Sequence, residues 1–154
     1  DSEEGCVPRK KIRLRSYSKD KHSVGNTLLE IKISSVEGRY KTSSKLFNLN
    51  KALSIGILDS DYGICMPKVR VTYTREYFSI HNVRLTIDQD IKYEKINSDG
   101  QNIYLNTDSN IIVEIKADMG VPIEYLFKIF PFERTRFSKY SRAINYSLIG
   151  DVNA

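Results

Sequence analysis

The stretches Leu29-Glu30-Ile31-Lys32 and Val113-Glu114-Ile115-Lys116 carry the same pattern, in which apolar side chains alternate with an acid and a base. Each lies in a run typical of a β-strand, where residues two positions apart point to the same side of the sheet. Each strand therefore places a carboxylate beside an ammonium group on one face and apolar side chains on the other. Arginines repeat the arrangement in Lys11-Ile12-Arg13-Leu14-Arg15 and in Val83-Arg84-Leu85-Thr86-Ile87-Asp88. The pattern predicts a sheet with one apolar and one charged face, which would suit a polyanion with its metal ion.

Length and charge indicate one globular domain with an anionic partner. The 154 residues suffice for a domain with its own core. The formal net charge of +5 favours nucleotide, polyphosphate, nucleic acid or a membrane surface as the partner. Cys6 and Cys65 are the only cysteines, so the sequence disfavours both a zinc site and a disulfide-rich secreted scaffold.

The sequence also bears on location. No apolar run approaches the ~20 residues that a membrane span needs, and no signal-peptide pattern is present. We therefore expect a cytoplasmic protein, which a membrane-protein partner outside this chain would hold at a membrane surface. Because the chain begins at Asp1 without a methionine and a strand follows almost at once, we also expect it to be part of a longer protein.

Hydrophobic periodicity predicts six strands and three helices. The expected strands cover residues 9–17, 27–34, 68–78, 83–93, 103–105 and 110–117. The expected helices cover residues 42–53, 122–130 and 138–148. Strands joined as hairpins, with helices between them, indicate an antiparallel α+β domain. No linker interrupts the pattern, so we expect residues 1–154 to form a single domain.

Strand parity sorts the side chains into two sets. One face collects Arg13, Arg15, Glu30, Lys32, Tyr73, Arg75, Arg84, Thr86, Asp88, Glu114 and Lys116. The opposite face collects Ile12, Leu14, Leu29, Ile31, Ile33, Val83, Leu85, Ile87, Val113 and Ile115. The charged face is either the solvated side of an open sheet or the inner wall of a barrel that encloses a small ligand. Recurring arginines favour the barrel, since a guanidinium donates two parallel hydrogen bonds to phosphate.

The carboxylates on the charged face have two alternative roles. Glu30, Asp88 and Glu114 either pair with neighbouring arginines or hold Mg²⁺ or Mn²⁺, hard ions that prefer oxygen and bridge phosphates. Glu114 is the leading metal candidate and Glu30 the second. His22 and His81 lie outside the charged set, and the chain has neither a P-loop nor a nucleophile elbow.

Six segments together resemble the VTC domain, the catalytic module of vacuolar transporter chaperone proteins, within the triphosphate tunnel metalloenzyme (CYTH-like) superfamily. The matching segments are Lys11-Ile-Arg-Leu-Arg-Ser-Tyr17, Leu29-Glu-Ile-Lys32, Val71-Thr-Tyr-Thr-Arg75, Val83-Arg-Leu-Thr-Ile-Asp88, Val113-Glu-Ile-Lys116 and Arg136-Phe-Ser-Lys-Tyr140. They run in the family's order over nearly the whole chain. Two features depart from the family: its early Glu-Arg-Lys-type and Tyr-Phe-Asp segments are not visible, and Arg136 stands where the family often has lysine.

The resemblance implies an antiparallel β-barrel, the triphosphate tunnel fold, with helices packed outside it and the N-terminal strands missing from this chain. It implies binding of ATP or another triphosphate and of polyphosphate with Mn²⁺ or Mg²⁺, and transfer of the ATP γ-phosphate onto a polyphosphate chain. The implied catalytic residues are Arg13, Arg15, Lys32, Arg75, Arg84 and Lys139. The implied substrate-binding residues are Tyr73, Lys116, Arg136 and Ser138, and the implied metal ligands are Glu114 and Glu30.

Three functions are compatible with this set of cationic residues. The first is polyphosphate polymerisation, the second is hydrolysis of tripolyphosphate or another triphosphate, and the third is non-catalytic binding of polyphosphate. Specific nucleic-acid binding is disfavoured, because only Tyr17 and Tyr73 stand among the cations where bases would stack on aromatic rings.

Overall fold

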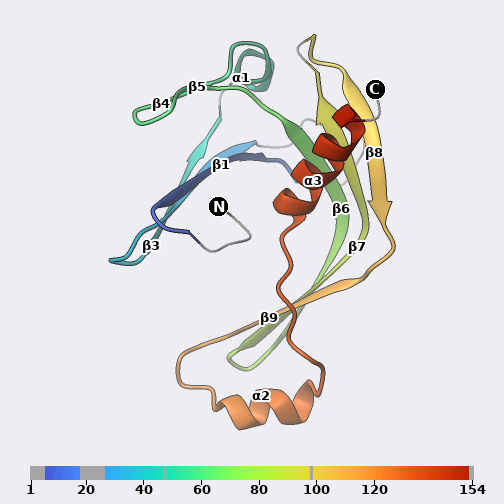
Figure 1. The fold of residues 1–154 in the computed structure, drawn as a ribbon. Coiled ribbons are helices and arrows are strands. Elements are labelled where there is room, and N and C mark those ends of the chain that lie inside the picture. The colour runs from blue at the N-terminus through green and yellow to red at the C-terminus, as the bar shows by residue number, and fades with distance from the viewer. Residues whose placement is uncertain (1–5, 18–26, 47, 98, 153–154) are drawn as a thin grey trace. The chain divides into compact units, whose positions relative to one another are not determined.

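The computed structural model describes residues 6–17, 27–46, 48–97 and 99–152, and it consists mostly of antiparallel sheets with three helices (Figure 1). This confirms the predicted α+β class. The chain divides into two compact units, Asp1–Pro67 and Lys68–Ala154. Each is described by itself below, and the expectation of one domain over residues 1–154 stays a prediction. Within the described residues, no helix is long and apolar enough to cross a membrane.

The first unit is built on a three-stranded antiparallel sheet. Its strands β1 (Arg9–Arg15), β2 (Leu28–Ser34) and β3 (Arg39–Lys45) lie side by side in that order (Figure 1). Helix α1 (Leu49–Ile55) follows, and then β4 (Ile57–Asp59) and β5 (Gly63–Cys65) form a short hairpin.

The helix predicted over residues 42–53 is partly wrong. Residues up to Lys45 belong to β3, because their backbone pairs with β2 along its whole length. The helix begins only at Leu49, where the Asn48 side chain accepts a hydrogen bond from the Lys51 amide at 2.9 Å. An asparagine at this position satisfies an otherwise unpaired amide at a helix start.

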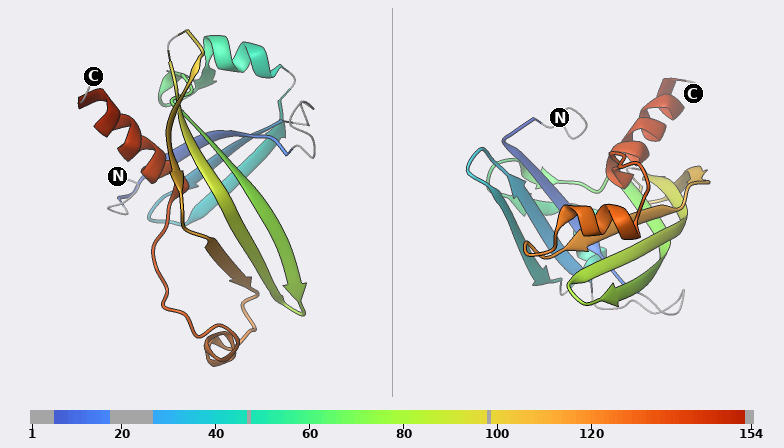
Figure 2. Two further views of the ribbon diagram at one scale, coloured as in Figure 1. Left: turned by 90° about the vertical axis from the view of Figure 1, so that its right-hand side faces the viewer. Right: turned by 90° about the horizontal axis from the view of Figure 1, so that it is seen from below.

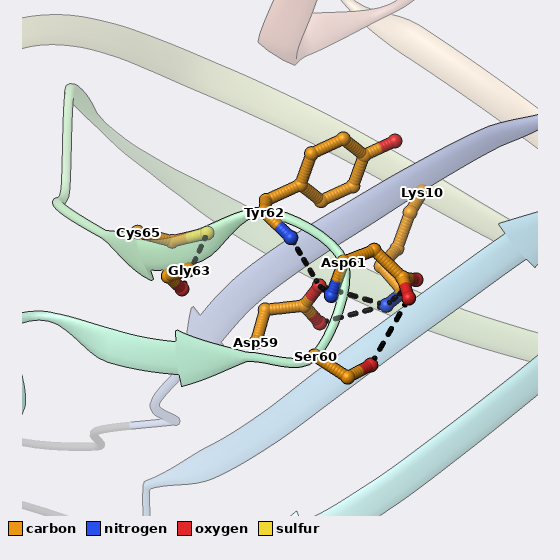
Figure 3. A network of polar contacts seen from close by, with 7 residues as sticks. All are labelled: Lys10, Asp59, Ser60, Asp61, Tyr62, Gly63 and Cys65. Atoms are coloured by element: carbon orange, nitrogen blue, oxygen red, sulfur yellow. Dashed lines mark hydrogen bonds and ion pairs between the residues drawn. The ribbon is translucent and has the colours of Figure 1, made fainter.

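A lysine joins the β4–β5 hairpin to β1 (Figure 3). Lys10 Nζ lies 2.8 Å from Asp59 Oδ2 and 2.6 Å from Asp61 Oδ2. The other Asp59 oxygen accepts the backbone amides of Asp61 at 3.0 Å and Tyr62 at 3.2 Å. Because the Lys10 ammonium and both backbone amides donate to carboxylates of this turn, we assign the cluster a structural role in the first unit.

The second unit is a sheet centred on one long strand. Strand β7 (Val83–Ile96) pairs along one edge with β6 (Val69–Ile80). Its other edge pairs first with β9 (Ile112–Ala117) and then with β8 (Asn102–Asp108). Helix α2 (Ile123–Ile129) buries none of its residues, and helix α3 (Lys139–Val152) lies against the sheet (Figure 2).

A bulge in β7 brings the polar and apolar parts of one face together. Thr72 pairs with Lys92 and Thr74 with Gln89, so β7 carries an extra residue there, and Asp90 has a φ of 55°. An extra residue reverses the alternation of sides along a strand. Asp88 therefore points to the same side as Ile91 and Tyr93, although their numbers differ in parity.

The core of the second unit lies between this face and α3. Ile91, Tyr93 and Ala143 are fully buried there, with Val69, Val71 and Tyr146 among the side chains packed around them. The expected barrel with helices packed outside it stays a prediction, and within the second unit α3 packs on the face of the sheet that carries the charged residues. The first turn of α3 consequently reaches the candidate site.

Candidate functional site

The charged face predicted for the first unit is confirmed by strand register, and it is more basic than predicted. In this sheet, alternate residues of β1, β2 and β3 face the same side. That side carries Arg9, Lys11, Arg13, Arg15, Lys32, Arg39, Lys41 and Lys45, with Glu30 as its acid. Such a concentration of cations on one side of a small sheet produces a strongly positive potential, which attracts polyanions.

Three lysines form one row across this sheet. Lys11 is the direct partner of Lys32, and Lys32 is the direct partner of Lys41. Like charges in directly opposed positions destabilise a sheet. Lys41 offsets part of that repulsion through its contact with Glu30 at 2.6 Å, and the row adds to the positive charge of this face.

Glu30 contacts one lysine of this row and the two arginines beside it. Its side chain is 2% exposed and accepts contacts from Arg13, from Arg15 at 3.4 Å and from Lys41 at 2.6 Å. Burial pushes the pKa of Glu30 upward, but the hydrogen bonds from Lys41 and Arg13 outweigh it and lower the pKa to about 2. Glu30 is thus a buried anion that holds several cations in place on the face.

The second unit presents a comparable face, and here too register confirms the predicted set. Successive cross-strand rows join Arg75 to Asp88, Tyr77 to Thr86 and Ser79 to Arg84. On the other side of β7, Thr86 is opposite Glu114 and Arg84 is opposite Lys116.

Asp88 is the centre of this second cluster. The carboxylate is 1% exposed and accepts two hydrogen bonds from Arg75, Nε to Oδ1 and Nη2 to Oδ2 at 2.7 Å. Lys139, the first residue of α3, contacts Oδ2 as well. Burial opposes ionisation of Asp88, yet the hydrogen bonds from Arg75 and Lys139 hold the pKa of its carboxyl below the usual range. Two cations from distant parts of the sequence are therefore fixed on one buried anion.

Aromatic rings complete this cluster. The Tyr73 ring lies 5.2 Å from the Arg75 guanidinium and 4.8 Å from Lys139 Nζ. The Tyr77 ring lies 5.8 Å from the same guanidinium. Tyr73 therefore lies beside Arg75, as predicted, and its role in substrate binding stays a prediction.

Farther along the same face the groups are less constrained. Arg84 is exposed and has no hydrogen-bond or ion-pair partner among the residues that the structure describes. Glu114 is 47% exposed, with Lys116 Nζ at 3.2 Å. Between them, the Thr86 hydroxyl is buried without a partner in the described part of the chain. Buried hydroxyls are normally hydrogen-bonded, so this part of the face has unused hydrogen-bonding capacity.

The last two predicted residues lie before α3. Ser138 Oγ accepts the Ser141 amide at 3.3 Å, which makes Ser138 the N-terminal cap of the helix. Arg136 is exposed in the segment that leads to it. Their roles in substrate binding stay predictions.

Comparison with known families decides the assignment. A family profile for the VTC domain matches residues 59–148, which is more than half of the chain. The chain belongs to the VTC domain family. This confirms the resemblance seen in the sequence, and with it the triphosphate tunnel (CYTH-like) superfamily. No curated protein and no solved structure matches the chain.

The two candidate metal ligands of this VTC domain differ in their surroundings. Across the described ranges, no group of three or more His, Cys, Asp or Glu side chains gathers. Glu30 is engaged by several cations, which favours the ion-pair alternative. Glu114 is half exposed and, among the residues described, pairs with Lys116, so it fits the usual Mg²⁺ arrangement of one or two carboxylates completed by water and phosphate oxygens.

Sequence reasoning missed some parts of the VTC domain site. Lys41 was overlooked because its strand was interpreted as a connection and a helix. Asp108 and Arg142, which join β8 to α3 at 2.7 Å, carry no motif. Sequence spacing could not predict the Asp108–Arg142 contact, because it joins a strand residue to a helix residue 34 positions later.

Proposed function

We propose that this VTC domain is a polyphosphate polymerase-like phosphotransferase, which moves the γ-phosphate of ATP onto a polyphosphate chain. The observation that carries the proposal is the lysine row Lys11–Lys32–Lys41 in a family associated with polyphosphate-related catalysis. A row of like charges suits a ligand that repeats negative charge along its length.

The reaction would break the bond between the γ-phosphorus and the oxygen that bridges it to ADP, and ADP would leave with the electron pair. A terminal oxygen of the polyphosphate would form the new bond to phosphorus. Such transfer depends on positioning and on neutralising charge, more than on a covalent nucleophile. The chain therefore needs cations fixed in direction, and it needs no catalytic histidine.

The second cluster supplies cations of this kind. Arg75 donates Nε and Nη2 to Asp88 and also hydrogen-bonds the Tyr77 side chain, so its guanidinium is held in a fixed orientation on this face. Lys139 has three N–H donors and uses one on Asp88. Arg84 adds a guanidinium without a protein partner among the described residues, and Lys116 lies opposite it on β9.

The divalent ion belongs with Glu114 in this proposal. Mn²⁺ or Mg²⁺ held there would neutralise charge on the phosphate oxygens. Arg13, Arg15 and Lys32 on the first unit would bind further phosphates.

The test is the purified chain incubated with ATP and Mn²⁺, followed by separation of products by length. Polyphosphate chains would support the polymerase. Orthophosphate alone would support a triphosphate hydrolase with the same cradle. Saturable binding of tripolyphosphate without any product would leave a binding module, and absence of both binding and products would overturn the proposal.

A further inference from the structure

Two acids of the second sheet each hold one cation of α3. Asp88 on β7 holds Lys139, and Asp108 at the end of β8 holds Arg142 at 2.7 Å. Lys139 and Arg142 are three residues apart, which places them on one side of a helix. The first turn of α3 is therefore attached to the sheet at two points, only one of which belongs to the phosphate site.

Asp108 has all its hydrogen-bonding capacity in use. Its Oδ2 accepts from Arg142 Nη1 at 2.7 Å and from the Tyr93 hydroxyl at 3.1 Å. Its Oδ1 accepts the backbone amide of Asn110 at 3.1 Å and the side-chain amide at 2.9 Å. The carboxylate is 3% exposed, and burial opposes its ionisation, but these hydrogen bonds and the Arg142 charge lower its pKa. Asp108 is thus a buried carboxylate whose oxygens are engaged by protein donors.

Apolar packing surrounds the same attachment. Ala143, next to Arg142, is fully buried against Ile91 and Tyr93. The Tyr146 ring lies 5.4 Å from the Tyr93 ring. The Phe137 ring lies 4.8 Å from the Arg142 guanidinium and 5.5 Å from Lys139 Nζ. These contacts pack the first two turns of α3 against the sheet beside Lys139.

We propose that Arg142 is a positioning residue, whose ion pair with Asp108 fixes the first turn of α3 so that the Lys139 ammonium faces the bound phosphate. This rests on the proposed function, since it assumes that Lys139 contacts substrate. Asp88 shares its carboxylate between Arg75 and Lys139, and a phosphate that draws on both cations weakens that attachment. No phosphate competes with Asp108 for Arg142 in this proposal, so the ion pair keeps the first turn of α3 in place while Lys139 contacts its ligand.

The test is a double-mutant cycle on tripolyphosphate affinity, measured by calorimetry on the folded chain. Lys139→Met and Arg142→Met are each expected to weaken binding by about tenfold, the scale of one lost charge-assisted hydrogen bond. The double variant is expected to bind no more weakly than Lys139→Met, because Arg142 acts through Lys139. Arg70→Met is the matched control: Arg70 is a β6 arginine on the other side of the sheet, 3.9 Å from Glu94, and its loss should leave affinity unchanged.

The outcomes separate cleanly. Additive losses, or unchanged affinity in Arg142→Met, would overturn the positioning role while leaving the proposed function standing. A wild-type chain that binds no tripolyphosphate would overturn both. If Arg142→Met does not fold, Tyr93→Phe removes one donor from Asp108 and keeps the packing. Tyr93→Phe should then weaken binding, and that effect should vanish in the Lys139→Met background; if it persists there, the inference is wrong.

Discussion

Arg75 on β6 and Asp88 on β7 lie directly opposite each other, and the guanidinium grips the carboxylate through both of its oxygens, with Nη2 2.7 Å from Oδ2. The Asp88 side chain is 1% exposed and that of Arg75 is 17% exposed. The pair has two roles: the guanidinium compensates the charge of a buried acid, and the carboxylate holds that guanidinium on the charged face. Mutations here must be judged by stability and by binding together.

Arg75→Ala should lower the free energy of unfolding by about 3 kcal/mol, because it leaves a buried carboxylate with Lys139 as its remaining ionic partner. Urea denaturation measures the loss. Adding Asp88→Asn to this variant removes the unpaired charge and should recover part of the stability. A loss in Arg75→Ala below ~1 kcal/mol, the range of exposed pairs, would mean that the pair is not a buried one.

Acid should act on the first unit through Glu30. Its folded-state pKa of about 2 lies below the ordinary value of 4.5, so its stabilisation is present above the ordinary pKa and is lost as pH falls toward about 2. Glu30→Gln should be less stable than wild type near neutral pH, and the two unfolding free energies should converge as the solution approaches the folded-state pKa. Thermal melting over a pH series measures this, and a constant gap at every pH would refute the assignment.

Glu114→Gln should reduce the dependence of tripolyphosphate affinity on Mn²⁺ and leave metal-free binding largely intact. The carboxylate is 47% exposed and its Lys116 pair is a surface pair, so the fold should be unaffected. Glu94→Gln is the control, because Glu94 pairs with Lys92 and Arg70 and lies outside the charged set. Equal Mn²⁺ dependence in Glu114→Gln and wild type would remove Glu114 from the metal site.

Thr86→Val should leave the ligand-free chain as stable as wild type, or more stable by up to ~1 kcal/mol. The Thr86 hydroxyl is buried without a partner in the described residues, and exchanging an unsatisfied hydroxyl for a methyl of the same shape removes a desolvation cost. Thr74→Val, an exposed change on the neighbouring strand, is the control. Chemical denaturation that shows Thr86→Val markedly less stable would indicate that the hydroxyl does have a partner.

Strand parity predicted much of the site, because the two-residue repeat of a strand fixes which side chains share a face. Arg13 does lie opposite Glu30, and Arg84 does lie opposite Lys116. Parity also predicted the apolar partners of β7, since Leu85 is opposite Ile115.

Strand parity could not predict features that depend on contacts between residues far apart in the sequence. The extra residue at Asp90 has no glycine to signal its positive φ of 55°, yet it decides that Tyr93 shares a face with Asp88. The strand around Lys41 consists of polar residues without alternation, and only pairing with β2 makes it a strand. Attachment of α3 through Arg142 likewise depends on a carboxylate from another strand.

The central claim is that the charged faces bind a chain of phosphates, and the tripolyphosphate affinity of Arg84→Ala tests it most directly. Arg84 is exposed and has no partner within the described residues, so its removal should change the free energy of unfolding by less than ~0.5 kcal/mol. We predict that this variant binds tripolyphosphate at least about tenfold more weakly than wild type, as expected for a lost charge-assisted contact, while Arg70→Ala binds normally. Equal affinity in Arg84→Ala and wild type would contradict the account.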